Sequence, residues 1–286
     1  MPHELLIGGA DPAPPAPPAP VPVAGVASFS TVDWPGRLAA TAFLAGCPWR
    51  CGYCHNPALQ TVHGGAPDAG AAGWAGLTGL LAARRGLLDA VVFSGGEPTM
   101  HRGLPAAVDA VRDLGFEVGL HTCGAYPVAL RRLLAGGRVD WVGLDVKADP
   151  GDPEGHARVV YGGLGAGRGG VPAARLRAAE HVRRSLALVL DAAPAVEVRT
   201  TVWPGATGAG ALAAIGRRLR AAADAAGRGD LTWAIQHARA TGVDRAAAAT
   251  AGLDPDAPAA PDADRRARLL AAAREAAGDR IRVIDR

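Results

Sequence analysis

Short apolar segments that alternate with longer helical ones place the strongest limit on what this chain can fold into. Residues 38–45 form a compact apolar run bounded by Gly46, which suits a buried strand better than a helix. Six strand-then-helix units of this kind follow one another. The strands are predicted at 38–45, 90–93, 117–120, 140–144, 195–201 and 232–235, and the helices at 77–88, 104–114, 128–134, 174–190, 211–226 and 264–277. Such alternation predicts an α/β fold with a parallel sheet, right-handed crossovers and strands buried on both faces.

Each predicted strand ends in residues that a purely structural barrel does not require. These ends are the cysteine-rich stretch 47–54, the glycine-rich stretch 94–98, and the polar or turn segments 121–124, 145–147, 203–205 and 236–239. In α/β barrels the chemistry lies at the carboxyl ends of the strands. We therefore expect these segments to meet around one site.

Three of the four cysteines fall within eight positions, as Cys47, Cys51 and Cys54 with the spacing C-x3-C-x2-C. Three thiolates on one loop suit an iron–sulfur cluster, and a four-iron cluster held by three cysteines keeps one iron open for another ligand. Structural zinc with His55 as the fourth ligand is the alternative, although zinc sites usually add a second ligand pair farther along the chain. A disulfide is disfavoured because no secretory signal precedes the motif.

A second motif, Gly95-Gly96-Glu97-Pro98 after Ser94, lies downstream of the cysteines. Together with Tyr53 before the last cysteine, it resembles the signature of the radical S-adenosylmethionine enzymes. Within that superfamily the chain most resembles the activating enzymes of glycyl-radical enzymes, above all the activating protein of anaerobic ribonucleoside-triphosphate reductase. The resemblance covers roughly residues 26–239, and its further marks are the segments 33–37, 54–57, 143–148 and 199–205.

The resemblance implies a partial (β/α)6 barrel of the TIM type with two cofactors, a 4Fe-4S cluster and S-adenosylmethionine. Cys47, Cys51 and Cys54 would hold the cluster, and S-adenosylmethionine would chelate the open iron. Reductive cleavage would then form the radical that abstracts hydrogen from a glycine of the partner enzyme. The implied electron donor is flavodoxin or ferredoxin.

The same resemblance assigns cofactor-binding residues. Tyr53 would flank the adenine, and Ser94, Gly95, Gly96, Glu97 and Pro98 would form the loop at the methionyl end. The two glycines would let the backbone approach closely, because they lack a Cβ. Glu97 would accept from the cofactor's ammonium, the alternative being a solvated glutamate at a helix start.

Three further residues are candidates on later strands. Asp145 and Lys147 alternate along one strand and therefore face the same side, where they are either beside the cofactor or a structural ion pair. Arg199 would reach the cofactor's carboxylate, or form an ordinary ion pair. Gln236 and His237 are weaker candidates on the sixth strand.

One stretch departs from the family pattern. Many activating enzymes carry Asp-Thr-Asn-Gly at the third strand end, whereas this chain has His121-Thr122-Cys123-Gly124. The change puts a cation site near the cofactor in doubt. His121 is either a cofactor contact or a satisfied core histidine, and Cys123 is interpreted as a passive thiol because a fourth cluster ligand would block the open iron.

Composition and sequence patterns bear on the class of partner, the location in the cell and the division into domains. The net charge is +3, with both signs interspersed, which argues against a nucleic-acid partner. No signal peptide is evident, and no apolar run reaches the ~20 residues of a membrane span, so a cytoplasmic protein is expected. We expect a Pro/Ala-rich disordered leader at 1–22 and one domain at 23–286, with its core at 37–240, a loop at 150–172 and a terminal helix and strand within 264–286.

Three other functions stay open on the sequence alone. The chain could activate another glycyl-radical enzyme, such as the pyruvate formate-lyase type, or act on a small molecule as 7-carboxy-7-deazaguanine synthase does. The third is a non-catalytic iron–sulfur or zinc protein, which has no use for the Gly-Gly-Glu-Pro turn.

Overall fold

Eight strands form one sheet whose spatial order follows the order of the chain. The structure is a computed structural model that describes residues 21–61, 73–162, 171–204, 207–239, 241–254, 256 and 261–286. The strands are β1 Val23–Ser30, β2 Ala39–Leu44, β3 Ala90–Gly95, β4 Glu117–Thr122, β5 Trp141–Asp145, β6 Ala195–Val202, β7 Leu231–His237 and β8 Ile281–Asp285. β1 runs antiparallel to β2, and every later pair is parallel. The α/β prediction is confirmed, with an open parallel sheet that is a partial barrel.

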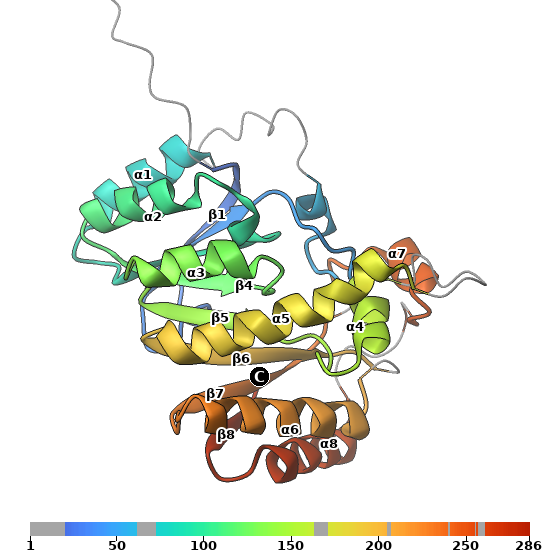
Figure 1. The fold of residues 1–286 in the computed structure, drawn as a ribbon. Helices are drawn as coiled ribbons and strands as arrows, with labels where there is room; N and C mark the ends of the chain where they lie inside the picture. The colour runs from blue at the N-terminus through green and yellow to red at the C-terminus, as the bar shows by residue number, and fades with distance from the viewer. Residues whose placement is uncertain are drawn as a thin grey trace, which may run out of the picture.

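The helices that connect these strands lie on one side of the sheet (Figure 1), as right-handed crossovers between successive neighbours require. They are α1 Trp74–Ala83, α2 Leu104–Asp113, α3 Pro127–Ala135, α4 Pro153–Val160, α5 Ala173–Ala192, α6 Ala209–Ala225 and α8 Ala263–Ala277. The short helix α7 Arg245–Thr250 lies apart from this layer, next to Gly52, and short 3-10 turns are formed by η1 Pro57–Gln60 and η3 Pro98–Met100. No helix in the described part of the chain is long and apolar enough to cross a membrane.

Three sequence predictions need correction. The segment 150–172 contains α4, which begins at an N-cap where the Asp152 side chain accepts from Gly155 N. The first helix ends at Ala83 rather than 88, because Gly86 takes φ +75° and turns the chain. The short helix α7 was not predicted.

The ends of the described chain extend the predicted core. β8 pairs in parallel with β7 and lies at the edge of the sheet as a seventh parallel strand. The first 20 residues of the predicted leader lie outside the described residues, as do residues 163–170 of the glycine-rich loop. The last two residues of the predicted leader belong to the fold, because Val21 is buried and Pro22 O accepts a hydrogen bond from Ala45 N.

A turn after β1 closes the amino end of the barrel. Gly36 has φ +81°, and Trp34 stacks on Trp141 with ring centroids 5.6 Å apart. A Cβ at Gly119 would lie 2.9 Å from the Trp34 ring, so the indole fills the space that a side chain on β4 would otherwise occupy. The opposite end of the barrel, where the parallel strands terminate, is left for the site.

Candidate cofactor pocket

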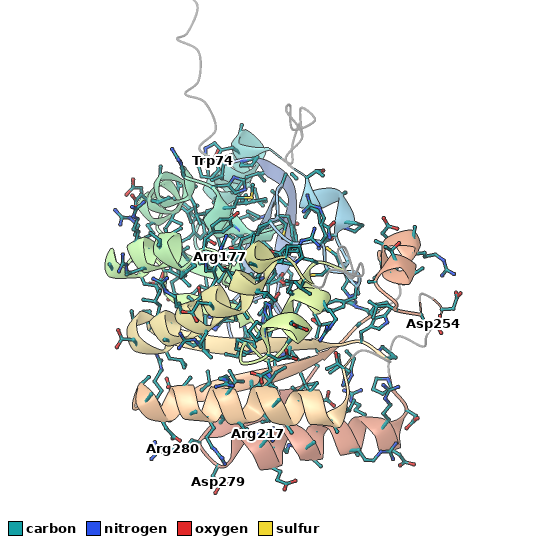
Figure 2. All side chains as sticks on the ribbon, turned by 45° about the vertical axis from the view of Figure 1, so that its right-hand side comes forward. Trp74, Arg177, Arg217, Asp254, Asp279 and Arg280 are labelled. Atoms are coloured by element: carbon teal, nitrogen blue, oxygen red, sulfur yellow. The ribbon has the colours of Figure 1, made fainter. Side chains whose placement is uncertain are left out.

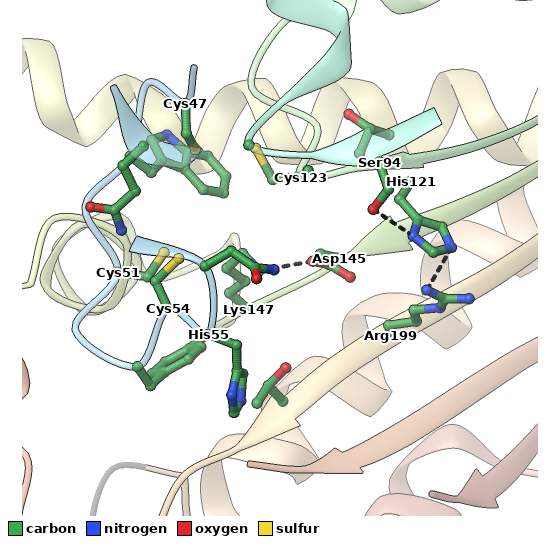
Figure 3. A pocket seen from close by; sticks show the side chains of 18 of the residues that line it. Cys47, Cys51, Cys54, His55, Ser94, His121, Cys123, Asp145, Lys147 and Arg199 are labelled. Atoms are coloured by element: carbon green, nitrogen blue, oxygen red, sulfur yellow. Dashed lines mark hydrogen bonds and ion pairs between the residues drawn. The ribbon is translucent and has the colours of Figure 1, made fainter. Parts of the chain in front are cut away.

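A cavity of about 230 Å³ lies where the parallel strands end (Figure 3). It brings together most of the predicted site residues, namely Cys47, Cys51, Tyr53, Cys54, Ser94, Gly95, Gly96, His121, Asp145, Lys147 and Arg199. Glu97 and Pro98 do not line it. Residues that sequence reasoning did not assign to the site also line it, among them Trp49, Asn56, Gln60 and Thr201. Residues of five of the six predicted strand ends line the cavity, whereas Trp203 and Pro204 at the remaining end do not.

The cysteine loop, residues 47–57, is held mainly through its backbone. Its entry is tied to η1, since Gly46 N donates to Leu59 O at 2.7 Å and Cys47 N to Gln60 O at 3.2 Å. Its middle is tied to α4, since Arg50 N donates to Val160 O at 2.8 Å. These bonds hold the loop while leaving the side chains of its cysteines free to face the cavity.

The three thiols lie in different surroundings. Burial raises the pKa of Cys51 to about 12, whereas a hydrogen bond from Cys123 lowers the pKa of Cys47. Among the described residues, no three His, Cys, Asp or Glu side chains are gathered closely enough to hold a single metal ion. The three cysteines nevertheless line the same cavity, and thiols on one loop are the donor set that an iron–sulfur cluster takes. The donor set fits the cluster.

Gly95 and Gly96 have a structural reason that the sequence did not reveal. Gly95 has φ +114°, and a Cβ there would lie 2.3 Å from Leu44 N. A Cβ at Gly96 would lie 2.0 Å from Gly46 O. The two backbone segments are also hydrogen bonded, because Gly96 N donates to Leu44 O at 2.8 Å. The two glycines therefore let the end of β3 pack directly against the entry to the cysteine loop.

Glu97 is fully buried and its carboxylate is occupied by the protein itself. Oε1 accepts from Thr99 N at 3.0 Å, from Thr122 Oγ1 at 2.7 Å and from Thr99 Oγ1, while Oε2 accepts from Cys123 N at 2.7 Å. The side chain joins the loop after β3 to the end of β4. Its binding of a cofactor ammonium stays a prediction, and Thr122, a neighbour of His121, is a partner that the sequence did not indicate.

Asp145 and Lys147 face one another in the pocket, 2.8 Å apart (Figure 3). Burial opposes the charge on both groups, yet their mutual attraction raises the pKa of Lys147 well above its usual value and lowers the pKa of Asp145. The predicted ion pair is present and lines the pocket, and the predicted role of both residues beside a cofactor stays a prediction. It presents one cation and one anion to any bound molecule.

His121 is hydrogen bonded on both ring nitrogens. Nε2 lies 2.8 Å from Arg199 Nη1, which can only donate, and 2.8 Å from Asp33 O, which can only accept, so the two contacts call for opposite tautomers of the ring. Nδ1 lies 3.0 Å from Ser94 Oγ, a hydroxyl that can donate or accept and therefore suits either tautomer. Burial and the Arg199 charge lower the pKa of His121 to about 4. The ring is thus neutral near neutral pH.

Arg199 belongs to a network beneath the pocket that we call the charged layer, formed by Asp33, His121, Glu197, Arg199 and Arg286. Arg199 Nε donates to Glu197 Oε1 at 2.8 Å, and Arg286 binds both oxygens of the same carboxylate at 2.8 and 2.7 Å. Arg199 Nη2 donates to Asp33 O at 2.7 Å. Arg199 is therefore ion-paired as well as exposed to the pocket, and Glu197 and Arg286 were not anticipated.

Tyr53 stacks on Trp203, with ring centroids 6.2 Å apart, and both rings are buried. Tyr53 Oη and Trp203 Nε1 have no hydrogen-bond partner among the described residues. Of the two weaker candidates, Gln236 lines the pocket, whereas His237 Nε2 lies 2.8 Å from Asp285 Oδ1 and does not. An unpartnered Tyr53 hydroxyl in the pocket wall is suited to receive a polar group of a bound molecule.

Comparisons with known proteins agree with this geometry. Residues 41–207 match the family model described as the Radical SAM superfamily. A protein of Methanocaldococcus jannaschii named "Putative glycyl-radical enzyme activating enzyme MJ1227" is 33% identical over 141 residues, which are 44% of this chain and 50% of that protein. The chain thus matches about half the length of that curated relative.

Among solved structures, SuiB of Streptococcus suis bound to the precursor peptide SuiA is similar with a TM-score of 0.48 and 12% identity. The match covers 69% of this chain and 39% of that one. SuiB itself has a TM-score of 0.46, with 67% and 37% covered. Because the family model spans more than half of the sequence and includes all three cysteines of the pocket, the chain belongs to the radical SAM superfamily.

Proposed function

We propose that this protein activates a glycyl-radical enzyme by abstracting a hydrogen atom from a glycine of that partner. The single observation that carries the proposal is the convergence of three cysteines, a Lys–Asp pair and Arg199 on one pocket at the strand ends. The name of the Methanocaldococcus jannaschii relative supports the activating role. The finer proposal, that the partner is anaerobic ribonucleoside-triphosphate reductase, is supported by the residues that resemble that reductase's activating protein.

Cys47, Cys51 and Cys54 would hold a 4Fe-4S cluster, and the pocket beside them would hold S-adenosylmethionine. When bound, this pair supplies one-electron reductive cleavage of the sulfonium. Lys147 presents a cation and Asp145 an acceptor, which complement the carboxylate and ammonium of an amino acid. The neutral ring of His121 adds no charge, so Arg199 and Lys147 carry the positive charge of the pocket.

Tyr53 lines the pocket next to Cys54, and Trp203 stacks behind it without lining the pocket. An aromatic ring in this position would favour a flat ring such as adenine. The Tyr53 hydroxyl, which lacks a partner among the described residues, would then gain one from the ligand. This role agrees with the position of Tyr53 in the signature.

The proposal is tested by anaerobic reconstitution of the full chain with iron and sulfide, reduction with dithionite and incubation with S-adenosylmethionine. We expect 5′-deoxyadenosine and methionine to form, and formation to vanish in Cys47→Ala. A fully loaded protein that cleaves no cofactor, with or without a glycyl-radical enzyme, would contradict the proposal.

The partner is identified in a second step. The reconstituted protein is mixed separately with anaerobic ribonucleotide reductase and with a formate-lyase type enzyme, and the glycyl radical is measured by electron paramagnetic resonance. We expect the radical signal on the reductase. A signal on the formate-lyase type enzyme alone would keep the activating role and overturn the finer proposal.

A further inference from the structure

A second cavity, of about 650 Å³, lies outside the cofactor pocket and shares no lining residue with it. It lies between η3 and the start of α2 on one side and α3 and α5 on the other, and α3 and α5 pack side by side (Figure 1). Its cationic residues are Arg102, Arg132 and Arg184 with His101 and His181, and we call it the arginine groove. The apolar part includes Tyr126, Leu133 and Val128, and the last is 46% exposed.

The charge of the arginine groove is unbalanced. No Asp or Glu lines it, and within the described ranges Arg102, Arg132 and Arg184 take part in no ion pair. A neighbouring shallow cavity shares Arg184 and adds Arg131, with Asp191 as its acidic member. Other surface arginines do have acidic partners, for example Arg37 with Glu117 and Arg183 with Glu180. The groove differs in gathering several arginines around one cavity that no acidic residue lines. Uncompensated cations around an exposed apolar centre suit a negatively charged protein partner.

A thin wall separates the groove from the cofactor pocket. Thr99 lines the groove and donates to Glu97, and Glu97 accepts from Cys123, which lines the pocket. Cys123 and Cys47 both line the cofactor pocket. Ala125 and Tyr126, two and three residues beyond Cys123, form part of the groove wall. Thr99, Glu97 and Cys123 thus connect the groove to the wall of the pocket that Cys47, a predicted cluster ligand, also lines.

This arrangement decides between two kinds of partner. A glycine that loses hydrogen to the cofactor must enter the pocket itself, and no lining residue of the groove opens into that pocket. An electron donor needs only to come near a cluster ligand, because an electron can cross a short stretch of packed protein. Redox partners also form small, charge-dominated interfaces. The groove therefore fits the donor and not the radical substrate.

We propose that the arginine groove is the docking surface for an acidic one-electron donor protein, an inference that rests on the proposed function. In the docked complex one electron leaves the reduced donor and enters the cluster held by Cys47, Cys51 and Cys54. The donor is oxidised by one electron and the cluster is reduced by one. No covalent bond forms or breaks in this step.

The test uses the reconstituted full chain and an acidic flavodoxin as the probe. The variant Arg132→Glu/Arg184→Glu reverses two groove charges, and Arg217→Glu/Arg274→Glu makes the same change in net charge on the α6 and α8 side. Arg217 lies on α6, far from α3 (Figure 2). All four arginines are exposed, so none of the changes buries a new charge.

Binding is measured by titration calorimetry at two salt concentrations. We expect the groove variant to raise the flavodoxin Kd about 30-fold and to weaken its salt dependence, while the control variant stays within about twofold of the parent. Cofactor cleavage driven by reduced flavodoxin should fall in parallel. Cleavage driven by dithionite, which needs no docking, should be unchanged.

The outcomes separate this proposal from the proposed function. Unchanged flavodoxin binding in the groove variant overturns the docking surface, whatever the cleavage result. Weakened binding of the glycyl-radical enzyme in place of flavodoxin also overturns it. Absence of cleavage with dithionite in the parent chain counts against the proposed function, while the calorimetric comparison still decides the docking surface.

Discussion

The cysteine loop is held by its main chain, whereas the charged layer beneath it is held by its side chains. In the loop, backbone bonds from Gly46, Cys47 and Arg50 fix the path, and the thiols and the Tyr53 hydroxyl keep bonding capacity. In the charged layer, Glu197 is bound by two arginines at 2.7 to 2.8 Å. The loop is therefore built to receive a group from outside, and the layer is complete without one.

The largest expected effect comes from a substitution in the cysteine loop that leaves the charged layer intact. Cys51→Ala removes one of three thiols that would hold the cluster, so iron and sulfide bound after reconstitution should fall to background. The free energy of unfolding of the cluster-free protein should change little by comparison. Iron analysis and urea unfolding measure the two quantities, and Cys123→Ala is the matched control, which should keep its cluster. Normal iron content in Cys51→Ala would refute the assignment.

Gly96→Ala should damage the join between β3 and the loop. A Cβ placed 2.0 Å from Gly46 O forces the backbone apart, and we expect a loss of about 3 kcal/mol in unfolding free energy together with poorer cluster binding. The control is Gly79→Ala in α1, where no atom lies within 4 Å of the added Cβ. That change should stabilise the protein by about 1 kcal/mol. Equal effects of the two variants would contradict the packing argument.

Glu197→Gln breaks the charged layer and spares the loop. Two arginines would lose their shared carboxylate in a site where the Glu197 side chain is only 4% exposed, which should cost about 3 kcal/mol. Thermal and urea unfolding measure the loss, and the cysteine loop should still bind iron. Glu154→Gln, from an exposed pair 3.5 Å long, should cost less than about 0.5 kcal/mol. A stable Glu197→Gln protein would show that the layer is dispensable.

The smallest expected effect is on the pH dependence of stability, and it comes from His156, a residue behind the cysteine loop. His156 is fully buried against Trp49, and neither ring nitrogen has a partner in the described part of the chain. Burial, together with the Lys147 charge, lowers its pKa to about 4 from 6.5. Because the folded pKa lies below the unfolded value, the unfolded chain binds the proton first. Stability is thus lost as pH falls below 6.5 toward 4.

His156→Leu should remove about 2 kcal/mol of the stability loss between about pH 7 and about pH 5. The measurement is urea unfolding at a series of pH values, with His55→Leu, a change at the edge of the pocket, as a comparison. An unaltered pH profile in His156→Leu would assign the acid sensitivity to other groups.

The fold was predictable to the extent that strands are short, apolar and buried on both faces. The run at 38–45 became β2, and the segment at 195–201 became β6, each shortened or extended by one residue per end at most. Helix α4 escaped prediction because its cap, Asp152-Pro153, lies among glycines that resemble a loop. The glycines favoured a loop prediction, although Asp152 and Pro153 are typical residues for the start of a helix.

Some residues of the site were likewise predictable from the sequence, and others were not. Spacing along the sequence identified the cysteines and the strand-end residues Asp145, Lys147 and Arg199, because parallel strands bring their ends together. It could not identify Glu197 or Arg286, because both lie more than 140 residues beyond the cysteine motif and meet only through side-chain contacts in the folded chain. The ligand-approach role of Gly95 and Gly96 stays a prediction, and the sequence did not reveal that the backbone of Leu44 and Gly46 also requires a glycine at both positions.

That backbone constraint separates the shape of the pocket from its chemistry. The spacing between the strand end and the cysteine loop is set by two residues that have no side chain, through contacts to Leu44 and Gly46. The side chains of Asn56 and Gln236 line the pocket but take no part in this join. Substitutions at such positions would change what the pocket binds and leave the width of its opening as it is.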